Sequence, residues 1–168
     1  MSEILVRLIR EDEIPALCEA EGDNSEDNIQ YYQRHLNWQK EGECAFLIAF
    51  LDGEIAGYVF LLYQDRWGSM AEARLPGLAD LNVFPWNRRQ GVGNALLEKA
   101  EELAAQHADT LHLDVHVTAH AGQAHRLYFR RGYMPDGKGV YHKYKPYDTA
   151  LGEVDPEDLT VLLIKKLR

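Results

Sequence analysis

The stretch LNVFPWNRRQGVGNAL occupies residues 81–96 and is the most informative part of the sequence. An apolar strand pattern ends early in it, a polar segment follows, and Gly91 and Gly93 open a helical pattern. Glycines let the backbone approach a ligand closely, and the start of a helix presents N–H groups with partial positive charge. Arg88 and Arg89 add two cations just upstream. The stretch therefore predicts a site for a phosphate or diphosphate group.

Two familiar nucleotide-binding patterns do not match this stretch. A P-loop requires Gly, four residues and then Gly-Lys-Ser/Thr, which the chain lacks. A dinucleotide fingerprint requires Gly-x-Gly-x-x-Gly/Ala, and the third position here is Leu96. A bare Gly-x-Gly is also compatible with a tight loop that binds no ligand. A Rossmann-type nucleotide-binding domain is therefore the weaker alternative.

The segments on either side alternate between strand and helix patterns. Asp52-Gly53 separates two apolar runs, which is the strongest short-range signal for a β-hairpin. Because a hairpin is antiparallel, a purely parallel sheet is excluded, and we expect a mixed α/β fold of three layers. The expected strands are residues 3–9, 45–51, 54–63, 79–83, 111–117, 139–145 and 159–166, and the expected helices are residues 12–21, 25–41, 92–107 and 121–131.

Composition narrows the class of protein. The 168 residues are enough for one domain with its own core, so residues 1–168 are expected to form a single domain. The formal net charge of −9 disfavours nucleic acid and anionic membranes as partners. The two cysteines do not form a disulfide framework, and their spacing is not that of a zinc site. No secretory signal is visible at the start of the sequence. We therefore expect a cytoplasmic protein.

A second motif strengthens the ligand prediction. The sequence AHRLY at residues 124–128 is followed by Gly132-Tyr133, and it comes after Arg88-x-x-Gly91-x-Gly93 with a helix and a strand between. Together the two motifs resemble those of the GNAT N-acetyltransferase superfamily, and the resemblance covers nearly the whole chain. It implies a GNAT-like three-layer α/β/α fold, with a central mixed, mostly antiparallel sheet of about seven strands.

The resemblance also implies which residues hold acetyl-CoA, the acetyl-donor co-substrate. Backbone groups of the 81–83 strand would pair with the pantetheine arm as if it were an added strand. Many members carry Asn three residues before the second motif's Ala, where this chain has Ala121. The implied acetyl-CoA contacts are Leu81, Asn82, Val83, Arg88, Arg89, Gln90, Gly91, Val92, Gly93, Asn94, Ala121, Ala124 and Leu127.

The implied reaction is direct transfer of an acetyl group to a primary amine of a small molecule or peptide, in a ternary complex. Tyr128 of the second motif would act as the general acid for the departing thiolate. Without the motif, an aromatic residue in that helix would be interpreted as core packing. Cys18 and Cys44 lie away from both motifs, so a covalent acyl-enzyme is disfavoured.

An acceptor amine is mostly protonated near neutral pH, so the reaction needs a base. We predict Asp80, which alternates with Leu81 and shares a strand face with Asn82. The alternative is the polar face of His112, Asp114 and His116 on the next strand. Three ligands along one strand are poorly arranged around one ion, so we predict no metal there.

The acceptor side carries a one-sided charge pattern. From Glu11 to Gln33 the chain has eight acids and no Lys or Arg, which suggests the hypothesis of a cationic acceptor. A solvated helix face explains the same run without any ligand. Trp67, in a loop after a strand, is a candidate for lining the acceptor pocket. A regulatory module that binds acyl-CoA without turnover is the alternative function, and a homodimer is left open.

Overall fold

The computed structural model describes residues 1–168 and contains two compact units. The N-terminal unit comprises Met1–Tyr63 and Leu78–Leu103, and the C-terminal unit comprises Gln64–Gly77 and Ala104–Arg168. Each unit is therefore built from two separate stretches of chain. No helix combines the length and the apolar composition that crossing a membrane requires.

The N-terminal unit is built on four strands in the order β1-β2-β3-β4. The antiparallel pairs β1–β2 and β2–β3 follow the predicted hairpin, in which Asp52 and Gly53 have φ of 51° and 87°. These left-handed values at both turn residues are what a tight two-residue hairpin requires. The strands are β1 (Ile4–Leu8), β2 (Cys44–Leu51), β3 (Glu54–Leu62) and β4 (Gly77–Val83), of which β4 joins this unit from Leu78 onward.

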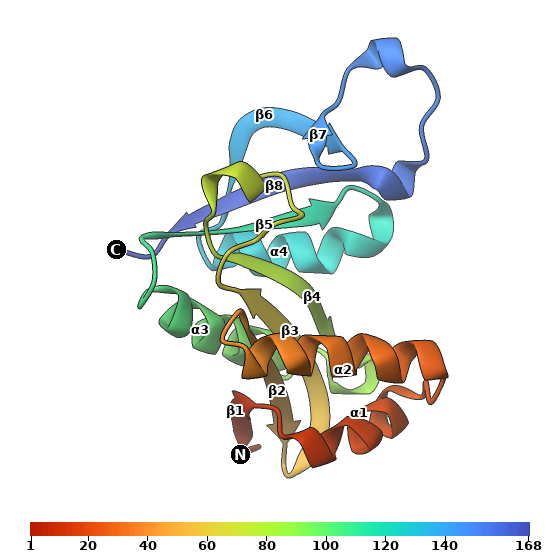
Figure 1. Cartoon of the computed structure of the whole chain (residues 1–168), viewed down its shortest axis with the longest axis vertical. Coiled ribbons are helices and arrows are strands. Elements are labelled where there is room, and N and C mark those ends of the chain that lie inside the picture. Colours follow the sequence, from red (N-terminus) through yellow and green to blue (C-terminus); the bar gives the residue numbers. More distant parts are fainter. The chain divides into compact units, whose positions relative to one another are not determined.

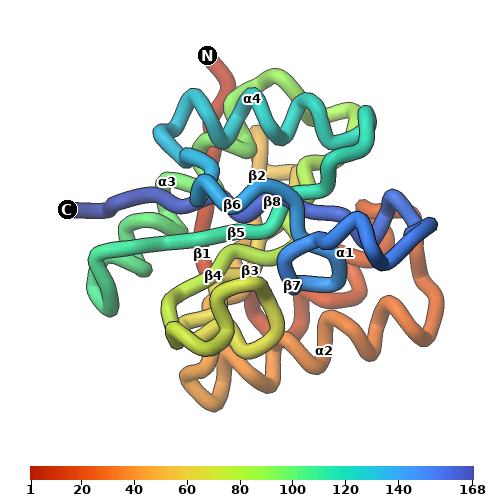
Figure 2. Tube along the Cα trace, turned by 90° about the horizontal axis from the view of Figure 1, so that it is seen from above, coloured from red at the N-terminus to blue at the C-terminus, as the bar shows by residue number.

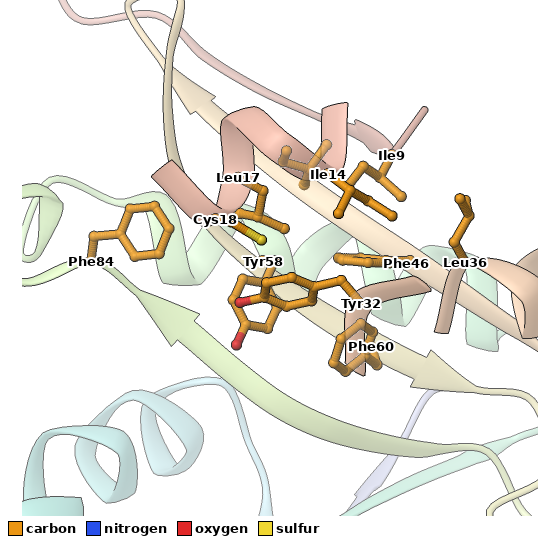
Figure 3. Packing of buried hydrophobic residues seen from close by; sticks show 11 residues of the cluster. Ile9, Ile14, Leu17, Cys18, Tyr32, Leu36, Phe46, Tyr58, Phe60 and Phe84 are labelled. Atoms are coloured by element: carbon orange, nitrogen blue, oxygen red, sulfur yellow. The ribbon is translucent and has the colours of Figure 1, made fainter. Parts of the chain in front are cut away.

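Helices α1 (Ile14–Glu21) and α2 (Glu26–Lys40) pack on one face of β2 and β3 (Figure 1). Ser25 caps the N-terminus of α2, because its side chain accepts a hydrogen bond from the Asn28 N–H at 3.3 Å. Apolar and aromatic side chains fill the space beneath the two helices (Figure 3). This core consists of Ile9, Ile14, Leu17, Cys18, Tyr32, Leu36, Phe46, Ile48, Tyr58, Phe60 and Phe84.

Helix α3 (Val92–Ala104) begins directly after the glycine-rich stretch but ends three residues earlier than predicted. Near its end Leu103 is half-buried, and His107 lies exposed beyond the last helical residue. The buried apolar side chains of α3 are Val92, Leu96, Leu97, Ala100 and Ala104.

The C-terminal unit has four strands in the order β5-β8-β6-β7, all paired antiparallel. Helix α4 (Gly122–Arg130) lies on one face of them, and residues 64–77, here called the strap, lie on the other (Figure 2). Strand β6 begins earlier than predicted, and its register with β8 is irregular between Pro135 and Val140. The strands are β5 (Thr110–His116), β6 (Met134–His142), β7 (Lys145–Pro146) and β8 (Leu159–Lys166).

Candidate active site

The loop before α3 has the backbone geometry of an anion site. Arg89 and Gly91 have φ of 61° and 90°, so two left-handed residues turn the chain just before the helix. The first helical hydrogen bond runs from the Ala95 N–H to the Gly91 oxygen at 3.0 Å. The N–H groups of Val92 and Gly93 therefore have no partner in the helix and face the end where the helix dipole is positive. This loop fits the diphosphate that the sequence predicted.

Arg88 has a contact that the sequence did not suggest. Its Nε donates to the backbone oxygen of Val83 at 2.9 Å, which ties the loop back to the end of β4. The Val83 carbonyl is among the groups that the resemblance assigns to the pantetheine arm. In this structure Arg88 therefore links the end of β4 to the loop before α3.

Strand β4 directs two polar side chains towards α1 and α2. Asp80 accepts a hydrogen bond from the Tyr31 hydroxyl, and Asn82 Nδ2 donates to Glu21 Oε1 at 3.2 Å. The sequence predicted that Asp80 and Asn82 share a face of the strand. Ala79, the residue directly before Asp80, also packs against the core under the same helices. Asp80 has φ of 53°, and this left-handed residue breaks the strict alternation assumed from the sequence.

Glu21, the last residue of α1, is the centre of a hydrogen-bond network. Its Oε2 accepts from the Tyr32 hydroxyl and from Asn28 Nδ2 at 3.0 Å, in addition to the Asn82 contact. Tyr58 is hydrogen-bonded to Tyr32, and the two hydroxyls lie on the same side of the core (Figure 3). Burial raises the pKa of both phenols, so both stay neutral and Tyr32 remains a donor to the Glu21 carboxylate. The sequence indicated Glu21 only as one acid among eight.

In the C-terminal unit, His112 is fully buried, which corrects its predicted position on a polar or solvated face. Its Nε2 lies 3.0 Å from Asp65 Oδ2, and Asp65 also accepts from the N–H groups of Trp67 and Gly68. Burial alone would raise the pKa of Asp65, but these donors outweigh burial and lower it below its usual value. The His112–Asp65 pair therefore fastens the strap to β5.

Asp114 forms the second hydrogen-bonded contact between the strap and β5. It accepts from the hydroxyl of Ser69 and from the Ser69 N–H at 3.2 Å. Burial raises the pKa of Asp114 above its ordinary value, against the opposing effect of these donors. His116, the third member of the predicted polar face, is exposed. Nothing in the spacing of the sequence pointed to Asp65 or Ser69 as the partners.

Tyr128 is buried on α4, and its ring meets that of Tyr133 edge-on, with centroids 5.7 Å apart. Ala121 is also buried, at the start of the same helix, while Ala124 and Leu127 are half-buried. These four predicted residues belong to the C-terminal unit. The predicted residues from Asp80 to Asn94 belong to the N-terminal unit.

Known proteins resemble this chain in sequence. The family profile described as "Acetyltransferase (GNAT) family" matches residues 7–133. An N-alpha-acetyltransferase of Sulfurisphaera tokodaii is 31% identical over 134 residues, which is 68% of this chain and 76% of that relative.

Solved structures show the same fold. The ribosomal-protein-S18-alanine N-acetyltransferase from Escherichia coli has a TM-score of 0.67 at 18% identity, covering 98% of this chain and 94% of that one. The PaiA N-acetyltransferase from Thermoplasma acidophilum, in complex with coenzyme A, has a TM-score of 0.63 at 18% identity, covering 98% and 99%. The predicted three-layer α/β/α fold with a mixed sheet is confirmed, with eight strands where about seven were expected. The chain belongs to the GNAT acetyltransferase family, whose enzymes transfer an acetyl group from acetyl-CoA to an amine.

Proposed function

We propose that residues 1–168 form a single N-acetyltransferase domain that acetylates the α-amine of a peptide. The observation that carries the acetyl-CoA side is the pair of left-handed residues, Arg89 and Gly91, which open the N-terminus of α3. The choice of an α-amine is supported by the N-alpha-acetyltransferase relative. A small-molecule amine is the other acceptor class that the sequence allows.

The reaction we propose is direct attack. The amine nitrogen forms a bond to the thioester carbonyl carbon, the carbon–sulfur bond breaks, and the thiolate of CoA departs. Tyr128 donates a hydrogen bond and then its proton to the sulfur as negative charge develops there, because a phenol O–H is a donor that can act as a general acid. A base removes the extra proton of the acceptor ammonium before attack, and the nitrogen gives up one further proton as the amide forms, which balances the proton that the thiolate takes up.

Asp80 is the base we propose first, because its carboxylate lies on the β4 segment that leads into the phosphate loop. Its hydrogen bond from Tyr31 orients the carboxylate without neutralising it. Asp114 is the second candidate, since burial raises its pKa towards the range in which a base works near neutral pH. The two candidates are separable by substitution.

The cationic-acceptor hypothesis takes a narrower form in this structure. Of the eight acids between residues 11 and 33, Glu11 pairs with Lys40 and Glu13 pairs with Arg7 and Arg10, so part of the run is neutralised. Glu21 remains as a half-buried carboxylate held by side-chain donors beside β4. We propose that the cation it attracts is the acceptor's own ammonium group.

The first test combines a thermal-shift titration with a thiol-release assay. Acetyl-CoA and CoA should raise the melting temperature while ATP and NAD should not, since a ligand at 100 times its Kd stabilises by about 2.7 kcal/mol. Thiol release should occur with short peptides that have a free N-terminus and stop when that terminus is blocked. A CoA shift with no release on any amine would favour the regulatory acyl-CoA-binding module instead.

The base is tested by replacing each carboxylate with its amide. Asp80→Asn should lower kcat/KM by about 10²–10⁴-fold if Asp80 is the base, with Asp114→Asn much closer to wild type. Asn tolerates the left-handed backbone at position 80, so this variant changes the charge without straining the strand. The opposite ranking would assign the role to Asp114, and its raised pKa predicts an activity rise at higher pH than an ordinary Asp gives.

The cellular location and the oligomeric state of the enzyme are also part of what we propose. A cytoplasmic location is supported by Cys18 and Cys44, which are both free and buried, as thiols in reducing compartments usually are. A homodimer is supported only by the unpaired outer edge of β1, which size-exclusion chromatography with light scattering would test.

A further inference from the structure

An open hollow of about 460 Å³ lies along the outer side of α2 in the N-terminal unit. It is lined by Asp27, Gln30, Tyr31 and Arg34. These positions are three, four and seven residues apart, so they share one face of the helix. The hollow therefore offers one carboxylate, one amide, one phenol ring and one guanidinium to whatever occupies it.

Tyr31 connects this hollow to strand β4. Its hydroxyl donates to Asp80, the proposed base. Its ring is fixed on the inner side by Phe60, edge-on at 5.8 Å between centroids, and by His35 at 4.6 Å. A molecule that reaches from Asp80 to the hollow therefore has to pass the Tyr31 ring.

Arg34 lies over the face of that ring. Its guanidinium carbon is 5.9 Å from the ring centroid of Tyr31, and the side chain is exposed with no ion pair or hydrogen bond inside the chain. It is the first cation after the long acidic run that begins at Glu11, in a chain of net charge −9. An uncompensated guanidinium beside an aromatic ring favours a planar anion, and a carboxylate matches its geometry best.

We infer that Arg34 determines acceptor specificity by binding an acidic side chain of the peptide, at its second or third residue. This inference rests on the proposed peptide acceptor. An extended peptide advances roughly 3.3–3.6 Å per residue. The 5.9 Å from the centre of the Tyr31 ring to the guanidinium corresponds to about two residues of extended peptide, and the amine lies beyond that ring at Asp80, so the acidic side chain that reaches Arg34 does not belong to the first residue. The acceptor class is a peptide with a free α-amine followed closely by Asp or Glu.

Asp27 provides a matched control within the same hollow. It lies seven residues before Arg34, which places the two about 10 Å apart along the helix. Its charge is opposite, so removing it should not weaken binding of an acidic side chain. Both side chains are exposed, and neither belongs to the core of the unit.

The experiment measures kcat/KM for three peptides that differ only in having Glu, Gln or Lys at positions two and three. Wild type should prefer Glu over Gln and Gln over Lys. Arg34→Gln should lower the Glu-to-Lys ratio at least threefold, and Arg34→Glu should reverse the order. Asp27→Asn should leave the ratio unchanged or move it towards Glu. KM for acetyl-CoA should be the same in all four proteins.

Three outcomes would overturn the inference. Equal kcat/KM for the three peptides in wild type would do so, as would a ratio that Arg34→Gln leaves unchanged. Acetylation of small amines but of no peptide would remove the proposed acceptor class and this inference with it. In the first two cases peptides are still acetylated, so the proposed function survives and only the role of Arg34 is lost.

Discussion

Replacing Tyr128 by Phe is expected to lower kcat by about 10²–10⁴-fold. The substitution removes only the hydroxyl, so the departing thiolate loses its proton donor while the ring still packs against Tyr133. KM for acetyl-CoA should change little, because the phosphate loop is untouched. Steady-state thiol release at saturating peptide measures both parameters.

The matched control is Tyr133→Phe, the other ring of the same edge-on pair. Tyr133 is fully buried, so the control reports what losing a buried tyrosine hydroxyl does to folding in this part of the unit. We expect it to affect stability more than kcat. If Tyr128→Phe turns over at near the wild-type rate, Tyr128 is a packing residue and the acid must be sought elsewhere.

The second large effect is expected from Gly57→Ala on β3. A Cβ atom at this position would lie 2.4 Å from the Asn82 backbone oxygen and 3.0 Å from Val83 Cα. Both obstacles are backbone atoms of β4, which cannot move aside as a flexible side chain can. We expect a loss of about 1–3 kcal/mol in unfolding free energy, as overpacking usually gives. KM for acetyl-CoA should rise as well, because the displaced segment leads into the phosphate loop.

Gly122→Ala at the start of α4 is the control for this change. A Cβ there meets nothing within 4 Å, and φ of −59° is ordinary helix. Alanine should therefore be neutral or slightly stabilising at this site. Urea unfolding compares the two variants directly. Equal stability of Gly57→Ala and wild type would show that β3 and β4 separate easily at this point.

The structural features that the sequence predicted correctly are those that depend on neighbouring residues. The Asp52-Gly53 hairpin and the helix that begins after Gly91 both depend on residues within a few positions of one another. Each was predicted from the conformation or the hydrogen bond that its residue type favours. The two motifs also identified the family. The prediction of acetyl-CoA as the ligand came from this resemblance and not from the periodicity of the sequence.

The contacts that the sequence could not predict are those between distant positions. Glu21 meets Asn82 across 61 residues, and His112 meets Asp65 across 47. A strand pattern shows which side chains share a face but not which loop covers that face. His112 was therefore placed on a polar face when the strap in fact buries it. The left-handed Asp80 was missed for a different reason, since alternation assumes a regular strand.

The strap also has a consequence for the order in which the protein is made. Asp65 and Ser69 leave the ribosome 47 and 45 residues ahead of His112 and Asp114, their partners on β5. At about 5–20 residues per second, they wait roughly 2–10 s before those partners exist. The two units alternate along the chain, so cutting the chain at one place does not separate them. A nascent chain that stops before residue 110 would therefore expose the strap, where a protease or a chaperone would meet it first.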